Sequence, residues 1–375
     1  MRRIEFRRSP EADVAVLSRN LELWPVIRDV VRGMRVAEIE TIGAPIGFID
    51  ATRILRTARS AGTSLGYASM VAKVRSSRVK ILVAVDQSIE VIEELGRLMP
   101  EIPQVLIAHG STRPEVLVDF GKITRRAHRI LGVWGQADVD TYSKNVPDGV
   151  NCFVVGSLRN AGYLRRHPLD ASRQPQRPLL FVSQYSGVDE EREDSPQKRV
   201  QILFQIKNHL RRYCEKHHLP LTVALRPPAS ATLEAGQTDA ERNHYLKVFS
   251  GLQIEFTDPA SAHSTYLASD YADVTIGVPT GALTESFGRG NKVLMIRQAP
   301  ASGTYYGFPV EGDWLLTEPT YEEFSVRLDK LRAMSRETCA TAWRVPREYV
   351  CANAETDSPI ELVRECVGRI LDTTT

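Results

Sequence analysis

Short runs of aliphatic and β-branched residues alternate along the chain with longer segments whose apolar positions recur at helical spacing. Such runs are typical of buried parallel strands, and such segments are typical of the helices that connect them. Strands are predicted at 13–17, 36–42, 80–85, 104–108, 130–133, 152–155, 179–183, 221–226, 253–256, 273–276 and 292–296. Helices are predicted at 67–75, 89–98, 197–217, 239–249, 264–269, 281–287, 321–333 and 359–371. The pattern predicts an α/β protein with two doubly wound, Rossmann-like halves.

A polar, proline-bearing stretch from Arg166 to Pro178 separates the two halves. It has no apolar periodicity, and we interpret it as a linker. After the strand predicted at 292–296 no further strand alternation is evident, and the remaining apolar pattern is helical. We therefore predict an N-terminal domain over 1–165, a linker over 166–178, a C-terminal domain over 179–340, and a helical tail over 341–375 that packs at the domain junction.

The composition is that of an ordinary globular protein, with 375 residues of which 42% are hydrophobic and 25% are charged. At about 150 residues per domain, this length favours two domains that each bury a complete core. Lys and Arg number 48 against 46 Asp and Glu, so the formal net charge is +2. Nucleic-acid binding relies on a basic stripe, and this balance gives no case for nucleic acid as a partner.

The five cysteines are widely spaced and form no C-x-x-C pair. Only Cys214 has histidines nearby, so neither a structural zinc site nor a disulfide framework is predicted. The basic N-terminus leads into Ser9-Pro10 rather than an apolar segment, unlike a signal peptide. No run approaches the roughly 18 apolar residues of a membrane span. We expect a cytoplasmic protein, and attachment to a membrane surface stays open.

Candidate chemistry in the first half follows two predicted strands. Asp86 comes directly after the strand at 80–85, and His109-Gly110 follows the strand at 104–108. Ligands of open α/β sheets bind outside the carboxyl ends of strands, and a histidine in that position suits general-base chemistry near neutral pH. Asp86 is also suited to cap the next helix, and His109 to a hydrogen bond in a domain interface, so both alternatives stay open.

In the second half, Ser183 and Gln184 end the first strand and Arg226 ends the next. Small polar residues beside an arginine suit an anionic group, because a guanidinium binds phosphate in a bidentate way. An arginine near a strand end is also common on protein surfaces. These residues predict an anion site, with a plain surface arginine as the alternative.

The most informative segment is the one around Thr280, where an apolar strand enters the turn Pro279-Thr280-Gly281 and a short helix begins. The N-terminus of such a helix presents N–H groups and the positive end of the helix dipole, which together favour phosphate. Glu285, about one turn into the helix, is placed to accept hydrogen bonds from ribose or sugar hydroxyls, or is merely solvated. The segment matches neither the dinucleotide fingerprint nor a Walker A loop, which argues against ordinary NAD or ATP binding.

Two doubly wound halves, a linker, a late phosphate-type loop and a helical tail together resemble the GT-B glycosyltransferase architecture. The ordered motifs also look like those of bacterial surface carbohydrate biosynthesis proteins and, more distantly, of the CDP-glycerol glycerophosphotransferases of teichoic acid synthesis. The resemblance runs from about residue 13 to residue 328 and depends on the order of short motifs: Asp86, His109-Gly110, Val133-Trp134-Gly135, Val155 to Arg159, Val182 to Tyr185, and Thr280-Gly281 through Glu285 to Lys292.

This resemblance implies that the second domain holds a nucleotide-activated donor and the first offers the acceptor. His109 matches the His-Gly motif that supplies the glycerophosphotransferases with a base for the acceptor hydroxyl. Thr280 and Gly281 fall where that family has small hydroxyl residues on the donor phosphates. Where the family carries a further histidine this chain has Pro228, which favours a nucleotide sugar over CDP-glycerol.

The implied activity is a metal-independent glycosyltransferase in which His109 or Asp86 deprotonates an acceptor hydroxyl that then attacks the anomeric carbon of the donor. If the product retains configuration, Asp86 is instead a candidate nucleophile. The departing nucleotide would be held by the residues singled out in the second half, Ser183, Gln184, Arg226, Thr280, Gly281 and Glu285.

No cofactor or metal is expected, because arginine and helix N–H groups can neutralise the phosphates of the leaving nucleotide. The one Asp-x-Asp match, Asp138 and Asp140, directly follows Gly135, where helix capping is favoured over holding a cation.

The expected partners are a nucleotide sugar and a carbohydrate or lipid-linked acceptor. The basic face at Arg125 and Arg126 would meet anionic lipid of the inner membrane if the acceptor is lipid-linked, and a solvated helix end is the alternative. Three other functions stay open: a nucleotide-sugar 2-epimerase, a glycerophosphotransferase of the same architecture, and a non-catalytic, sugar-binding scaffold for which Pro228 argues.

Overall fold

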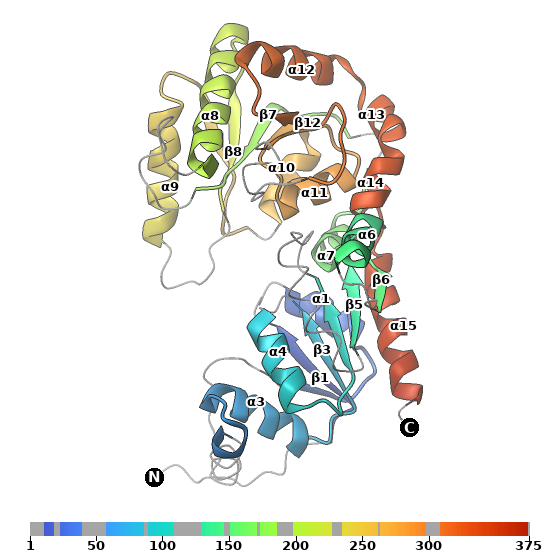
Figure 1. Ribbon diagram of the computed structural model, residues 1–375. Coiled ribbons are helices and arrows are strands. Elements are labelled where there is room, and N and C mark those ends of the chain that lie inside the picture. Colours follow the sequence, from blue (N-terminus) through green and yellow to red (C-terminus); the bar gives the residue numbers. More distant parts are fainter. Residues whose placement is uncertain are drawn as a thin grey trace. The chain divides into compact units, whose positions relative to one another are not determined.

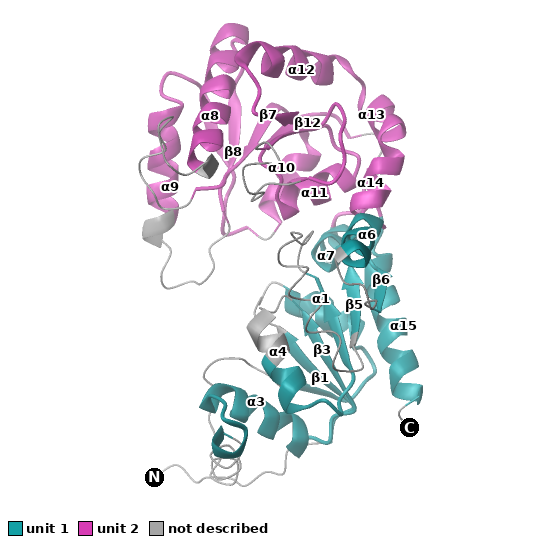
Figure 2. Ribbon diagram, viewed as in Figure 1, with its two compact units in different colours: residues 1–166, 356–375 teal, residues 167–355 magenta. Residues whose placement is uncertain are grey.

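In a computed structural model, the strands predicted from the sequence all form. With one additional strand they make two sheets, each of six parallel strands (Figure 1). The structure describes residues 11–18, 23–39, 58–85, 89–108, 129–145, 151–170, 173–185, 198–226, 235–261, 263–297 and 308–373. The chain divides into two units, Met1–Arg166 with Thr356–Thr375, and His167–Glu355 (Figure 2).

The sheet of the first unit has the strand order β2-β1-β3-β4-β5-β6. Its strands are β1 (Val14–Ser18), β2 (Val36–Ile39), β3 (Ile81–Val85), β4 (Gln104–Ile107), β5 (Arg129–Val133) and β6 (Cys152–Val154). The helices of this unit are α1 (Trp24–Val30), α3 (Leu65–Ser76), α4 (Ile89–Leu98), α6 (Gln136–Asn145), α7 (Leu158–Arg166) and α15 (Ser358–Thr373).

Alternation along the strands of the first sheet divides its apolar side chains between two cores. In β1, Val14 and Val16 belong to a cluster with buried residues of α1, α7 and α15. Ala15 and Leu17 belong to a second cluster with buried residues of α3, α4 and α6. Because successive side chains of a strand point to opposite faces, helices cover both faces of this sheet.

The last helix, α15, returns to the first unit, where it packs against α1 and α7. Arg364 donates to the carbonyl oxygens of Asp29 and Val30, the last two residues of α1. The Asp29 carbonyl oxygen also accepts from the backbone N–H of Arg32 at 3.4 Å, so the arginine adds to the bonds at this helix end and complements the negative end of the helix dipole. The tail predicted over 341–375 is therefore divided, because the second unit extends to Glu355.

The sheet of the second unit has the strand order β12-β11-β10-β7-β8-β9. Its strands are β7 (Arg177–Val182), β8 (Leu221–Ala224), β9 (Ile254–Phe256), β10 (Ala272–Gly277), β11 (Val293–Arg297) and β12 (Leu315–Thr317). Its helices are α8 (Lys198–His217), α9 (Ala235–Val248), α10 (Ser264–Asp270), α11 (Gly281–Gly288), α12 (Tyr321–Ala333), α13 (Arg336–Ala342) and α14 (Arg344–Val350).

Strand β12 corrects the expectation that no strand follows β11. It pairs in parallel with β11, with Met295 opposite Leu315. Only three residues long, it is too short to show the alternation by which a strand is recognised in a sequence.

Part of the stretch predicted as a linker is built into the second unit. Strand β7 begins at Arg177, and the backbone N–H of Gln176 already donates to the carbonyl oxygen of Tyr271 at 2.8 Å. Arg173 pairs with the buried carboxylate of Asp270 at 3.0 Å. The stretch lacks apolar periodicity because polar contacts to a segment about a hundred residues later, rather than apolar packing, fasten it.

Candidate functional site

The strand order of the second sheet reverses at β7. The chain proceeds from β7 to β8 and β9 on one side and then places β10 on the other side of β7. In open α/β sheets this reversal leaves a crevice outside the carboxyl ends of the two strands, where ligands bind. Gly277, the last residue of β10, lies so close to β7 that a Cβ atom on it would be 3.3 Å from the carbonyl oxygen of Val182. The residues that follow β7 and β10 therefore begin side by side.

The turn after β10 leads directly into helix α11, as predicted. Thr280 is the N-cap residue, and its hydroxyl oxygen accepts a hydrogen bond from the backbone N–H of Leu283 at 3.4 Å. The half-exposed Gly281 and Ala282 follow as the first two helical residues, and neither N–H has a partner in the helix. The Thr280 hydroxyl keeps its proton for donation. This end of α11 therefore offers hydrogen-bond donors at the carboxyl edge of the sheet.

Ser183 directly follows β7 and is buried. Its hydroxyl donates to the carboxylate of Glu241, lies 2.8 Å from the hydroxyl oxygen of Tyr245, and accepts from the backbone N–H of Tyr185 at 3.2 Å. The adjacent Gln184 donates from its side-chain amide to the carbonyl oxygen of Ser183 at 3.0 Å. The serine predicted to contact phosphate thus has three partners within the protein.

Arg226 is exposed, two residues beyond the end of β8. Its Nη1 donates to the carbonyl oxygen of Tyr185 at 3.0 Å, which links the segments that follow β8 and β7. No other side-chain partner of Arg226 occurs among the described residues. A guanidinium has five N–H donors, and only one of them is used by the described residues. The structure thus brings together Ser183, Gln184 and Arg226 through Tyr185, as expected for neighbouring strand ends.

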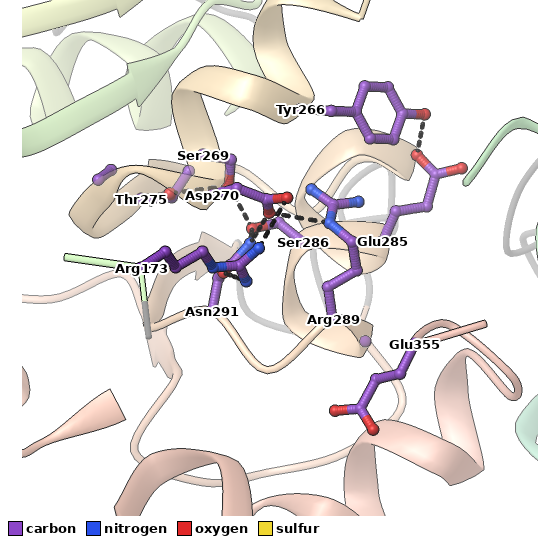
Figure 3. Close-up of polar contacts among 12 residues, drawn as sticks. Arg173, Tyr266, Ser269, Asp270, Thr275, Glu285, Ser286, Arg289, Asn291 and Glu355 are labelled. Carbon is purple, nitrogen blue, oxygen red and sulfur yellow. Dashed lines mark hydrogen bonds and ion pairs between the residues drawn. The ribbon is translucent and has the colours of Figure 1, made fainter. Parts of the chain in front are cut away.

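Glu285 is predicted to face a ribose, and the structure buries its side chain between α10 and α11. Its Oε2 accepts a hydrogen bond of 2.6 Å from the hydroxyl of Tyr266, a contact visible in Figure 3. The residue is only 2% exposed. The alternative of a merely solvated glutamate is therefore wrong, and contact with a ligand would require a further hydrogen bond by this carboxylate.

A buried polar network lies at the opposite, amino-terminal ends of β10 and β11. The carboxylate of Asp270 contacts Arg173, Arg289 and the side-chain amide of Asn291 (Figure 3). Arg336 donates to the carbonyl oxygens of Asp270 and Ala272, and burial lowers the pKa of this guanidinium. Because the network joins the end of α10 to the starts of two strands, we interpret it as structural.

In the first unit, β3 and β4 pair in parallel, with Val85 opposite Ile107. The two catalytic candidates, Asp86 and His109, follow these strands in the sequence and lie outside the described residues. The indole N–H of Trp134, which is buried, donates to the carbonyl oxygen of Ala108 at 3.2 Å. Trp134 thus fastens the end of β4, a role that sequence reasoning missed.

The Asp-x-Asp match supplies the third and fifth residues of helix α6, and Asp138 contacts the backbone just before the helix, in agreement with a capping role. Asp138 is buried and accepts from the backbone N–H of Trp134 at 3.1 Å, while Asp140 accepts from the side chain of Gln136 at 2.9 Å. In the described part of the chain no three His, Cys, Asp or Glu side chains gather in a way that could hold a metal ion. No described helix has the length and apolar character needed to cross a membrane.

No known family model matches this chain, and no curated protein matches its sequence. Solved structures match its fold. UDP-N-acetylglucosamine 2-epimerase from Rickettsia bellii superposes with a TM-score of 0.58 at 11% identity, covering 97% of this chain and 96% of that one. The wall teichoic acid polymerase TagF superposes with a TM-score of 0.52 at 10% identity, covering 97% of this chain and 90% of that one. Sucrose-phosphate synthase from Thermosynechococcus elongatus gives 0.51 at 10% identity, with 96% and 98% covered.

Likeness at this level of identity establishes the fold alone. Together with the two six-stranded parallel sheets and the C-terminal helix, it shows that the chain has a GT-B-like fold of two Rossmann-like units, as the sequence predicted.

Proposed function

We propose that this protein is a metal-independent glycosyltransferase that moves a sugar from a nucleotide-activated donor to a surface polysaccharide or glycolipid acceptor. The observation that carries the proposal is the reversal of strand order between β7 and β10. At that single carboxyl edge the second unit combines an exposed arginine, Arg226, with the N-terminus of α11. Both features favour anions, and a nucleoside diphosphate is the anion that a donor of this class carries.

In this proposal the donor phosphates meet three kinds of hydrogen-bond donor. The guanidinium of Arg226 supplies charge and paired N–H groups, and the Thr280 hydroxyl and the Gly281 N–H supply neutral donors at the positive end of α11. Such groups stabilise the charge that develops on the departing phosphate, which is the role a metal ion serves in other transferases. Gln184 and Glu285 complete the proposed donor site, Glu285 as a contact to ribose or sugar hydroxyls.

The acceptor side of the reaction stays with the first unit. His109 is the proposed base for the acceptor hydroxyl, with Asp86 as the alternative, and both follow neighbouring strands of one sheet. Removal of the acceptor proton as the oxygen attacks the anomeric carbon is what a general base contributes. The His109→Ala variant should lose transfer and keep donor binding.

The proteins that share the fold support a nucleotide-activated substrate. Their names include a UDP-N-acetylglucosamine 2-epimerase and a wall teichoic acid polymerase, the latter also solved after a soak with CDPG. The likeness to the epimerase makes a nucleotide-sugar 2-epimerase the second candidate. An epimerase needs no acceptor, whereas a transferase does, and this difference separates the two functions.

The deciding experiment incubates the purified protein with UDP-N-acetylglucosamine, UDP-glucose and GDP-mannose in separate reactions, first alone and then with a bacterial lipid extract as acceptor. NMR follows the anomeric signals, and a coupled assay follows released nucleotide. A transferase leaves the donor nearly intact until acceptor is added, and His109→Ala abolishes the accelerated release. A new sugar signal with donor alone identifies an epimerase, and equal release by His109→Ala contradicts the role given to His109.

A further inference from the structure

Glu241 is a buried carboxylate that the proposed reaction does not use. It lies on α9, which is placed beside α8 and strand β8 in Figure 1, and it is 4% exposed. Its Oε1 accepts a hydrogen bond from the hydroxyl of Ser183. Both carboxylate oxygens also face the backbone N–H of Arg226, at 3.3 and 3.4 Å. One side chain therefore contacts the residues that follow both β7 and β8.

The hydrogen bonds around Ser183 have only one consistent direction when Glu241 is ionised. A hydroxyl can donate one hydrogen bond, and Ser183 donates its bond to Glu241. The hydroxyl of Tyr245 must therefore donate to Ser183, over an O–O distance of 2.8 Å. The remaining lone pair of Ser183 accepts the N–H of Tyr185. With one donation and two acceptances its capacity is filled, so Ser183 serves the loop rather than a phosphate in this arrangement.

The same contacts hold Arg226 at two points. The backbone N–H of Arg226 donates to the carboxylate of Glu241, and its Nη1 donates to the carbonyl oxygen of Tyr185. Tyr185 in turn is held by Ser183, whose hydroxyl depends on Glu241. The path closes into a ring of hydrogen bonds that fixes both the base and the tip of the arginine. Preorganisation of this kind lowers the entropy that a ligand must remove on binding.

The negative charge of Glu241 does not itself favour an anionic ligand. Burial raises the pKa of Glu241, and the hydrogen bonds from Ser183 and Arg226 oppose that rise. A buried negative charge near a phosphate site also repels the ligand. A neutral amide of the same shape would keep an acceptor for both loops without that repulsion.

We infer that Glu241 is a positioning residue of the donor site, which orients Arg226 toward an anionic nucleotide by tying the loops after β7 and β8 together. This inference rests on the proposed function, because it assigns Glu241 to the same site. It predicts that nucleotide affinity depends on the acceptor oxygen of residue 241 and gains nothing from the charge.

The test titrates UDP, GDP and CDP separately into the full-length protein by calorimetry, at a temperature well below every variant's melting point. Glu241→Ala should weaken the binding that the wild type shows at least tenfold, equivalent to about 1.4 kcal/mol. Glu241→Gln should bind within about threefold of the wild type or more tightly, because the amide keeps an acceptor and removes the charge. Asp239→Ala, an exposed carboxylate on the same helix, should bind like the wild type.

The outcomes separate the two proposals. If the wild type binds none of the three nucleotides, the proposed donor site falls and the role of Glu241 falls with it. If the wild type binds and a folded Glu241→Ala binds equally well, only the positioning role is overturned, and equal losses in the Ala and Gln variants overturn it too. Should Glu241→Ala fail to fold, Ser183→Ala breaks the same ring and should weaken binding at least tenfold, whereas unchanged binding contradicts the inference.

Discussion

The Nη1 atom of Arg226 lies 3.0 Å from the carbonyl oxygen of Tyr185, so the residue two positions beyond β8 is joined to the one three positions beyond β7. Among the described residues this bond uses only one of the five N–H donors of the guanidinium. Since β7 also borders β10, the arginine and the first turn of α11 belong to one edge of one sheet. The proposed donor site depends on that arrangement.

The buried lysine of α8 predicts a specific dependence of stability on pH. Lys207 is 2% exposed, its Nζ lies 3.0 Å from Nε2 of His244, and burial lowers its pKa to about 7. Between pH 7 and the ordinary value of 10.5 the unfolded chain binds a proton that the folded chain does not, so stability rises with pH over this window. The slope is at most about 1.4 kcal/mol per pH unit.

Replacing this lysine should therefore remove that rise. Lys207→Met should be more stable than the wild type at pH 7 and below, and its stability relative to the wild type should fall toward pH 10. Urea unfolding at a series of pH values measures the difference, with Lys216→Met, an exposed lysine on the same helix, as the control. If the stability of Lys207→Met and that of the wild type changed in parallel with pH, the pKa of the buried amine would not be lowered.

The close approach of β10 to β7 predicts that replacing Gly277 destabilises the protein. A Cβ atom there would lie 2.9 Å from Cδ1 of Leu283 and 3.3 Å from the carbonyl oxygen of Val182. Gly277→Ala should lower the free energy of unfolding by about 1–3 kcal/mol, because a packed backbone must shift. It should also weaken nucleotide binding, since a shifted backbone at Gly277 leads directly into α11.

Gly368 supplies the matched control for that substitution. It lies inside α15, and a Cβ atom would meet nothing within 4 Å. Gly368→Ala should raise the free energy of unfolding by about 0.5–1 kcal/mol through helix propensity. Thermal melts of both variants check the pair, and a Gly277→Ala variant as stable as the wild type would contradict the close packing of the two strand ends.

The return of α15 to the first unit predicts that Arg364 stabilises helices α1 and α15 locally. Its bonds to the last carbonyls of α1 should each contribute of the order of 1 kcal/mol. Arg364→Met should speed amide hydrogen exchange in α1 and α15 without altering exchange in the second unit, whereas Arg369→Met, exposed on the same helix, should not. Unchanged exchange in α1 would refute this anchoring role.

The sheets could be predicted because each strand is a short apolar run bounded by turn residues. Runs such as Ile81–Val85 are buried on both faces of the sheet, and for that reason every residue in them is apolar. The extent of the second unit could not be predicted in the same way. Arg173 belongs to it through Asp270 and Asn291, and nothing near Arg173 in the sequence indicates these distant partners.

The candidate site was predictable where it follows strands and hidden where it does not. Ser183, Arg226 and Thr280 are found by asking which polar residues end an apolar run. Glu241 lies in a polar helical segment among other charged residues, where a solvent-exposed carboxylate looks the same as a buried one. Only the packing of α9 against the ends of β7 and β8 distinguishes it.

The most direct test of the donor site is calorimetric titration of UDP, GDP and CDP into the wild type, Arg226→Ala and Arg211→Ala. Arg211 pairs with Glu215 on the surface of α8, away from the strand ends, and controls for the loss of a positive charge. We predict that at least one nucleotide binds the wild type and Arg211→Ala alike, and that Arg226→Ala binds it at least tenfold more weakly. Absence of binding to the wild type, or equal binding by Arg226→Ala, would contradict a donor site at the carboxyl edge of the second sheet.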